Sequence, residues 1–205
     1  MENWEIKPNI GLGSLLFGMT REEVALYDTV YGTDPAVKQY GHSADSLLAD
    51  LGDFAGFFSE DILEGAQDAA REFDAETADL VEETRMEHCY VAFEYEREKL
   101  SSISIRNDCA QLNFDGDQVF PMPSQALLIK LQRLNRGAKV HNDDVLFEQL
   151  GLMLTGFYTQ SETGAWRFFQ DGRGPSSERF VTLFAPSRLN SYLTDAFLNV
   201  DFTTR

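Results

Sequence analysis

The sequence has few cysteines and no long apolar run. Only Cys89 and Cys109 are cysteines among 205 residues, and they fit neither a metal spacing nor a disulfide framework, so we expect two thiols in a reducing compartment. The longest apolar runs fall far short of the ~18 residues that span a bilayer. The stretch MENWEIKPNIGLG lacks the apolar region of a signal peptide. These absences predict a cytoplasmic protein that has no membrane partner.

Basic side chains are also scarce, and the acidic ones are concentrated in one segment. The chain carries 34 Asp and Glu against 17 Lys and Arg, for a net charge of −17. Residues 50–96 hold 15 acidic and two basic side chains, whereas residues 97–205 hold 12 of each. Such a segment repels nucleic acid and attracts a basic protein or metal cations. A solvated face that aids solubility explains the same charges, so both interpretations stay open.

The first readable unit predicts a strand, a tight turn and a capped helix. In LLFGMTREEV, Leu15 and Leu16 are typical of a strand end, and Gly18 permits the turn. Thr20 lies three residues before Glu23, which is the spacing of a capping box worth ~1 kcal/mol. The helix is expected to end at Gly32, where a glycine precedes a proline.

A similar unit returns in the second half of the chain, where QVFPMPSQAL occupies residues 118–127. Ser124 is the expected N-cap of a second helix that ends at Gly137. Its apolar stripe consists of Leu127, Leu128, Leu131 and Leu134. This repeat predicts that the two halves of the chain share one plan.

Hairpin patterns follow both units. Val91, Phe93 and Tyr95 alternate with polar residues, and alternation resumes after a turn with Ile103 and Ile105. Residues 151–172 repeat this pattern around a turn at 161–164. We therefore expect an α+β fold with helices packed on antiparallel sheet, in an N-terminal lobe of residues 1–110 and a C-terminal lobe of residues 111–205.

Residues 42–85 interrupt the first lobe and are predicted to be helical, with a break near residues 52–58. From Ser59 onward the pattern is amphipathic. The apolar face, which we expect to dock on the protein, carries Ile62, Ala66, Ala69 and Phe73. The opposite face, which is then left to meet a partner, carries Asp61, Glu64, Asp68 and Glu72.

The stretch from Leu16 to Val24, the sequence from Tyr31 to Pro35 and the hairpin from Val91 to Ile105 resemble small bacterial α+β domains of the β-lactamase-inhibitor-protein type. Members of this group pack a helical layer on an antiparallel sheet, often as tandem copies. Several serve as inhibitors or as immunity proteins against bacterial toxins. The resemblance covers the first half apart from residues 42–85, and the second half more faintly. It specifies a fold better than a function.

Catalytic and ligand motifs point to structural roles. His88 and Cys89 are neighbours in a predicted strand, so their side chains should point to opposite faces. NFDGDQ lacks the closing glutamate of a calcium loop and is typical of a hairpin turn. DGRGPSSE lacks the lysine of a P-loop. We expect no catalytic residue, no metal and no cofactor. A basic stripe could receive the acidic helix or an acidic ligand, or simply face solvent; it comprises Lys130, Arg133, Arg136 and Lys139.

These observations favour a non-enzymatic binding protein, namely an immunity-type inhibitor that occludes a basic toxin acting in the cytoplasm. The acidic face of the predicted helix is the expected contact surface. Phe54, Phe57 and Phe58 are either the aromatic anchors of this contact or core residues. Two alternatives remain: an adaptor or chaperone for a secreted effector, and an enzyme whose site is assembled from scattered carboxylates, with a metal for instance.

Overall fold

A computed structural model of the chain describes residues 2–40, 79–160, 166–168, 178–192 and 196–203, together with residues 62, 65, 68 and 69. The fold is α+β, as the sequence predicts. Its regular helices are short, and their bounds are η1 Glu2–Trp4, α1 Arg21–Ala25, α2 Asp28–Tyr31, α5 Ser124–Asn135, η3 Glu148–Leu150 and α6 Pro186–Tyr192.

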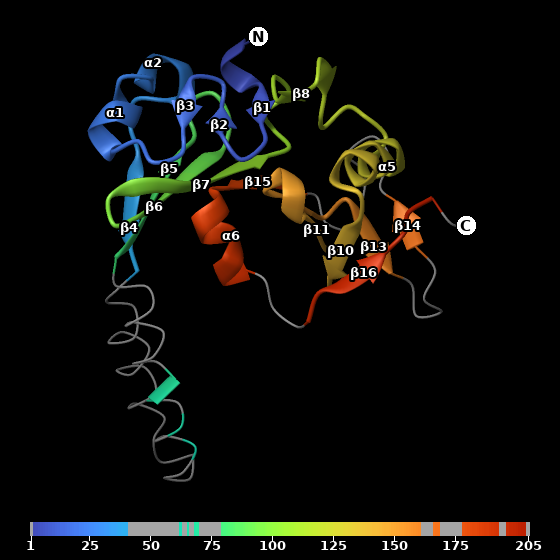
Figure 1. Cartoon of the computed structure of the whole chain (residues 1–205). Coiled ribbons are helices and arrows are strands. Elements are labelled where there is room, and N and C mark those ends of the chain that lie inside the picture. The colour runs from blue at the N-terminus through green and yellow to red at the C-terminus, as the bar shows by residue number, and fades with distance from the viewer. Residues whose placement is uncertain are drawn as a thin grey trace.

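Nine strands form one antiparallel sheet in the order β16-β10-β11-β12-β15-β7-β6-β5-β4 (Figure 1). Strands from the first half are β4 Ala36–Gln39, β5 Leu80–Arg85, β6 Val91–Glu96 and β7 Lys99–Arg106. Strands from the second half are β10 Ala138–His141, β11 Asp144–Phe147, β12 Leu152–Thr155, β15 Phe180–Phe184 and β16 Leu198–Val200. Both predicted lobes therefore contribute to a single sheet.

The two halves arrange their strands alike. Strands β4 to β7 lie side by side in chain order, as do β10, β11, β12 and β15. The halves meet where β7 pairs with β15, in a register that places Ser104 opposite Thr182. Smaller antiparallel pairings add the sheet of β1 Ile6–Lys7, β2 Gly11–Leu12 and β3 Leu15–Leu16, and the hairpins β8 Asn113–Phe114 with β9 Asp117–Gln118 and β13 Tyr158–Gln160 with β14 Trp166–Phe168.

One face of the main sheet, called here the inner face, holds the core. Phe93, Ile103 and Leu183 are paired across β6, β7 and β15, and each is almost fully buried. Helices α1 and α2 and strands β1 to β3 lie on one side of β5 to β7, whereas α6 lies on the other (Figure 1). The opposite face, called here the outer face, has a small apolar cluster where Leu189 of α6 packs with Leu146 and Phe184.

The two predicted helix starts differ in the structure. Thr20 is the N-cap of α1: its side chain accepts from the Glu23 amide, and its own amide donates to the Glu23 carboxylate at 2.7 Å. The prediction for Ser124 is wrong, because Pro123 is the N-cap and Ser124 is the first helical residue. The Ser124 hydroxyl is buried and has no hydrogen-bond partner in the described part of the chain. The two starts therefore share a position in the chain order but not a capping bond.

Charged side chains reach the inner face through strand β5. Arg85 is 2% exposed and contacts the Asp28 carboxylate, and it also donates to the Gly32 carbonyl at 2.8 Å. Glu83 is 4% exposed and accepts from the Arg21 side chain at 2.7 Å. These contacts pair each buried charge with a partly exposed charge of opposite sign, as burial of a charge requires. They attach β5 to α1 and α2.

The predicted helical segment 42–85 is corrected at its end, because residues 80–85 form strand β5. Residues 62, 65, 68 and 69 are helical, in agreement with the pattern from Ser59 onward. Ile62 and Ala69 are exposed, so the expected docking of the apolar face is not observed at these two positions. Among the described residues, no helix has both the length and the apolar composition to cross a bilayer.

Candidate functional site

The outer face presents a continuous row of side chains across all nine strands. Its centre is built from small residues, Thr84, Ala92, Ser104 and Thr182, where the Ser104 and Thr182 hydroxyl oxygens lie 3.0 Å apart. From one edge to the other the row runs Ala36, Thr84, Ala92, Ser104, Thr182, Met153, Leu146, Lys139 and Asn199. Because these central side chains are small, the larger side chains beside them project further from the sheet.

Two tyrosines and two glutamates lie beside this row, and we call them the Tyr–Glu patch. Tyr40 directly follows β4, Glu82 is in β5, Tyr90 directly precedes β6 and Glu94 is in β6. The Tyr40 hydroxyl donates to the Glu82 carboxylate at 3.2 Å. Burial raises the pKa of Tyr40 to about 12, with a further contribution from the negative charge of Glu82. Burial and Glu82 also raise the pKa of Tyr90. Glu82 therefore acts on both tyrosines, which remain neutral hydroxyl groups.

The chain's own cations contact the rings of both tyrosines. Lys38 lies 4.2 Å from the centroid of the Tyr40 ring, and the Arg106 guanidinium lies 4.9 Å from that of Tyr90. Phe180 packs edge-on against Tyr90 with ring centroids 5.8 Å apart. A cation over a tyrosine face is a favourable contact, worth about 0.5–1 kcal/mol at exposed sites. Both tyrosine rings of the patch therefore make cation–π contacts with basic side chains of the chain itself.

Part of the negative charge near the patch is neutralised within the protein. Glu94 is paired with Arg188 of α6 at 2.8 Å, and Asp108 with Arg106 at 2.6 Å. Partial burial alone would raise the pKa of Asp108, but hydrogen bonds from Arg106 and from the Tyr90 amide lower it overall. Such pairs fix the positions of the arginines. The Glu82 carboxylate instead accepts hydrogen bonds from the hydroxyl groups of Tyr40 and Thr84.

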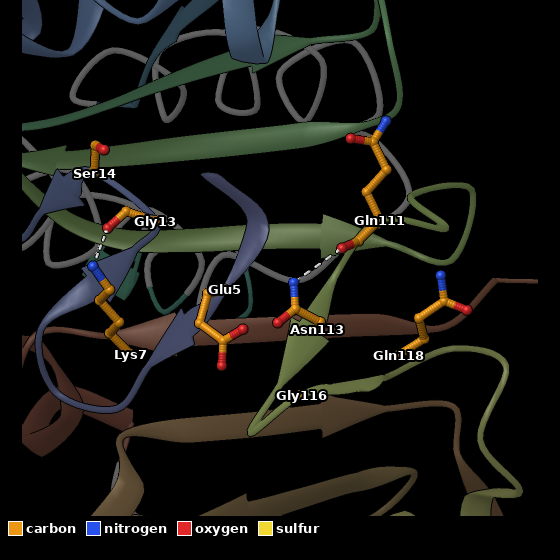
Figure 2. Close-up of a pocket in the computed structure, with 8 residues that line it drawn as sticks. All are labelled: Glu5, Lys7, Gly13, Ser14, Gln111, Asn113, Gly116 and Gln118. Carbon is orange, nitrogen blue, oxygen red and sulfur yellow. Dashed lines mark hydrogen bonds between the residues drawn. The ribbon is translucent and has the colours of Figure 1, made fainter. Parts of the chain in front are cut away.

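A cavity of about 740 Å³ lies between strand β1, the β2–β3 turn and the β8–β9 hairpin (Figure 2). The ammonium of Lys7 donates to the Gly13 carbonyl at 2.7 Å, and the Glu5 carboxylate accepts from the Asp115 amide at 2.9 Å. The remaining lining residues are Ser14, Gln111, Asn113, Gly116 and Gln118. These side chains offer polar contacts to a small molecule, but no nucleophile paired with a base.

The Asp115–Gly116 turn beside this cavity confirms the hairpin interpretation of NFDGDQ. Both residues have positive φ, 54° and 82°, and they join the paired strands β8 and β9. A two-residue turn of this hand matches the twist of the flanking strands. Among the described residues, no group of three or more His, Cys, Asp or Glu side chains has an arrangement that could hold a metal ion.

Most of the predicted contact residues lie outside the described part of the chain. These are Phe54, Phe57, Phe58, Asp61, Glu64 and Glu72. Asp68 is described; it is helical and exposed. The predicted basic stripe is partly paired with local acids, since Lys130 contacts Asp115 and Asp117, and Lys139 contacts Glu148 at 2.8 Å.

Sequence reasoning missed the Tyr–Glu patch, although one signal was present. Polar and apolar residues alternate along each strand, and Lys38, Tyr40, Glu82 and Glu94 are on the polar side. The order of the strands is needed to place these residues together. The Cys89–Cys109 neighbourhood was missed for the same reason.

Comparisons with protein-family models, with curated proteins and with solved structures gave no match.

Proposed function

We propose that this chain is a non-enzymatic binding protein, an immunity-type inhibitor that occludes a basic bacterial toxin in the cytoplasm. One observation carries the proposal: the Tyr–Glu patch and both ends of the acidic segment 41–78 share one edge of the sheet. The Tyr40 amide donates to the Leu80 carbonyl at 3.1 Å, so the segment leaves and re-enters the sheet at neighbouring residues. It contains ten acidic side chains and one basic side chain.

Charge and aromatic contact would have separate roles in such an inhibitor. A strongly acidic segment accelerates encounter with a basic surface, because long-range attraction steers the partner before contact. Tyrosines anchor the complex once it has formed, since they bury a large area and have few rotatable bonds. Inhibition is then steric, because the bound chain covers the site at which the toxin acts.

The parallel order of elements in the two halves supports an internal repeat. Each half has a helix followed by four antiparallel strands in chain order, with an interruption after β4 in the first half and after β12 in the second. On this proposal the halves are tandem domains of the β-lactamase-inhibitor-protein type, divided near residue 110 and fused through β7 and β15. Fusion of two small sheets yields one broad outer face that is wide enough to cover a protein active site.

The first test identifies the partner. The immobilised chain captures proteins from its native organism at low salt, and mass spectrometry identifies them. The expected result is a basic protein whose toxic activity the purified chain abolishes at equimolar concentration. A secretion-machine component that the chain carries without inhibition would instead indicate an adaptor, and turnover of a small molecule by the chain alone would indicate an enzyme.

The second test locates the contact surface with matched variants. Glu82→Gln keeps an oxygen that can accept from Tyr40, whereas Asp143→Asn makes the same charge change at an exposed site in the second half. Tyr90→Ala should weaken binding by about 2 kcal/mol or more if this ring is an anchor. Glu82→Gln should weaken it less, and Asp143→Asn should have no effect. Equal affinity of all three variants would exclude the Tyr–Glu patch.

The predicted acidic helix face needs its own variant. Reversal of Asp61, Glu64, Asp68 and Glu72 to Lys should leave the melting temperature nearly unchanged, because exposed charges contribute little to stability. The association rate should fall, and its dependence on salt should weaken, if these residues steer the partner. If the variant associates as fast as the parent at low salt, these acidic residues do not steer the partner and serve solubility only.

A further inference from the structure

Strands β6 and β7 bring the two cysteines to the same end of a hairpin. Cys89 precedes Tyr90, and Cys109 follows Asp108. The Arg106 amide donates to the Tyr90 carbonyl at 3.2 Å, and the Tyr90 amide donates to both Asp108 carboxylate oxygens at 3.2 Å. These backbone contacts hold the two segments together, so cysteines that are 20 positions apart in the sequence become neighbours in the fold.

The two thiols lie together inside the protein, because Cys89 and Cys109 belong to the same buried cluster of the core and each influences the pKa of the other. The two residues are 6% and 2% exposed. The Cys109 amide also donates to the Arg106 carbonyl at 3.0 Å, which fixes the turn that carries the thiol. No other cysteine occurs in the sequence. The sequence predicts two thiols without a partner, whereas the fold makes them a pair.

The environments of the two thiols differ in a way that assigns them different chemical roles. The hydrogen bond from Cys89 lowers the pKa of Cys109, and the backbone amides of Gln111 and Leu112 lower it further against the effect of burial. The same hydrogen bond and burial raise the pKa of Cys89. We assign Cys109 as the attacking thiol, because the thiolate is the reactive form of cysteine and the backbone amides of Gln111 and Leu112 stabilise it there.

A route for a small molecule lies next to the pair. A hollow of about 330 Å³ is lined by His88 and Gln111, which flank the two cysteines in the chain, and by Trp4. Its other lining residues are Asn3, Thr29 and Val30. His88 and Gln111 are exposed, whereas both cysteines are buried. Because of this burial, a small hydroperoxide should reach the thiols more readily than a bulky disulfide reagent.

We propose that Cys89 and Cys109 form a reversible disulfide when the protein meets hydrogen peroxide. The Cys109 thiolate attacks one peroxide oxygen, the O–O bond breaks, and hydroxide leaves, which yields a sulfenic acid on Cys109. Cys89 then attacks the Cys109 sulfur, its proton passes to the departing oxygen, and water leaves. In total, two thiols and one hydrogen peroxide give one disulfide and two waters.

This disulfide would connect the start of β6 covalently to the turn after β7. The same turn continues through Gln111 into the wall of the 740 Å³ cavity, and Tyr90 of the Tyr–Glu patch follows Cys89 directly. A crosslink that matches native geometry constrains the unfolded chain and stabilises the fold. Formation of this disulfide involves the chain alone and does not depend on the proposed toxin.

The experiment treats the folded, full-length chain with hydrogen peroxide, removes the excess with catalase, alkylates remaining thiols and weighs the intact protein. The expected product is a monomer that has lost two hydrogen atoms and reacts with no alkylating agent, and dithiothreitol restores both thiols. The oxidised monomer should melt at a higher temperature than the reduced form. Separate sulfinic acids, a disulfide between two chains, or thiols that stay reduced would each overturn the proposal.

Single variants test the two roles. In Cys89→Ala the sulfenic acid on Cys109 has no thiol to condense with, so dimedone should trap it. In Cys109→Ala the remaining Cys89 should react roughly tenfold more slowly than Cys109 does in the other variant, because its thiolate is disfavoured. Circular dichroism confirms that both variants are folded. Faster oxidation of Cys89 than of Cys109 would contradict the assignment of the attacking thiol.

Discussion

The guanidinium of Arg85 and the carboxylate of Asp28 form an ion pair that joins strand β5 to helix α2, and the two side chains are 2% and 31% exposed. Removing one member of a fully buried pair costs about 3–5 kcal/mol, whereas an exposed pair contributes less than about 1 kcal/mol. Because solvent reaches Asp28 but hardly reaches Glu83, which also contacts Arg85, Arg85→Met should lower the free energy of unfolding by an amount between these limits, as measured by urea denaturation.

Arg97→Met is the matched control for Arg85→Met, because Arg97 and its partner Asp79 are 80% and 68% exposed and their charged groups lie 3.8 Å apart. An exposed pair of this kind contributes less than about 1 kcal/mol. Similar losses in the two variants would show that burial of Arg85 has no energetic consequence.

We expect substitution by alanine to affect stability differently at the two helix starts. Thr20→Ala removes the hydroxyl that accepts from the Glu23 amide, and should cost about 1 kcal/mol of stability. The Ser124 hydroxyl is buried without a hydrogen bond among the described residues, so its removal ends an unfavourable burial. Thermal unfolding should therefore show a lower midpoint for Thr20→Ala and an unchanged or higher one for Ser124→Ala. A loss in the second variant as large as in the first would indicate a hidden partner.

The stability of the protein should depend on pH through the carboxyl group of Asp144. Burial raises the pKa of its carboxyl group, although the Thr155 hydroxyl donates to it at 2.5 Å. A raised pKa favours the protonated form in the folded state. Its contribution to stability is therefore present below the ordinary pKa of ~3.9 and is lost as the pH rises through the folded value.

Asp144→Asn is neutral at every pH and keeps an oxygen for Thr155. Its melting temperature should match that of the parent in acid and exceed it at pH 7, and differential scanning fluorimetry across this range measures the difference. Asp34→Asn, at an exposed position, should shift neither end of the range. A stability difference for Asp144→Asn that grows toward low pH would reverse the sign and contradict the argument.

Local signals were sufficient for several elements of the fold. The spacing of Thr20 and Glu23 predicted a capped helix, and the alternation from Val91 to Ile105 predicted the hairpin of β6 and β7. Each of these elements is determined by residues a few positions apart. The sequence could also locate the turn at Asp115 and Gly116, since this dipeptide favours positive φ.

Elements whose stability depends on distant partners were missed. Residues 80–85 seemed helical because Glu83 and Arg85 occupy inward positions where a strand normally carries apolar side chains. Their charges are neutralised by Arg21 and Asp28, which lie more than fifty residues earlier in the chain. The Tyr–Glu patch and the Cys89–Cys109 contact likewise require the strand order. Ser124 failed as an N-cap because Pro123 takes that place and the hydroxyl is directed into the protein.

Tyr40 and Leu80 are hydrogen-bonded neighbours, so the chain leaves the sheet and returns to it at the same place. Because the ends of the segment between them are joined by a backbone hydrogen bond, the sheet imposes no span that the segment must bridge. The entropic cost of closing such a loop rises only slowly with its length. Insertions, deletions and changes of charge there can accumulate without disturbing the register of β4 and β5. The length and charge of this segment can therefore change while the core residues remain the same.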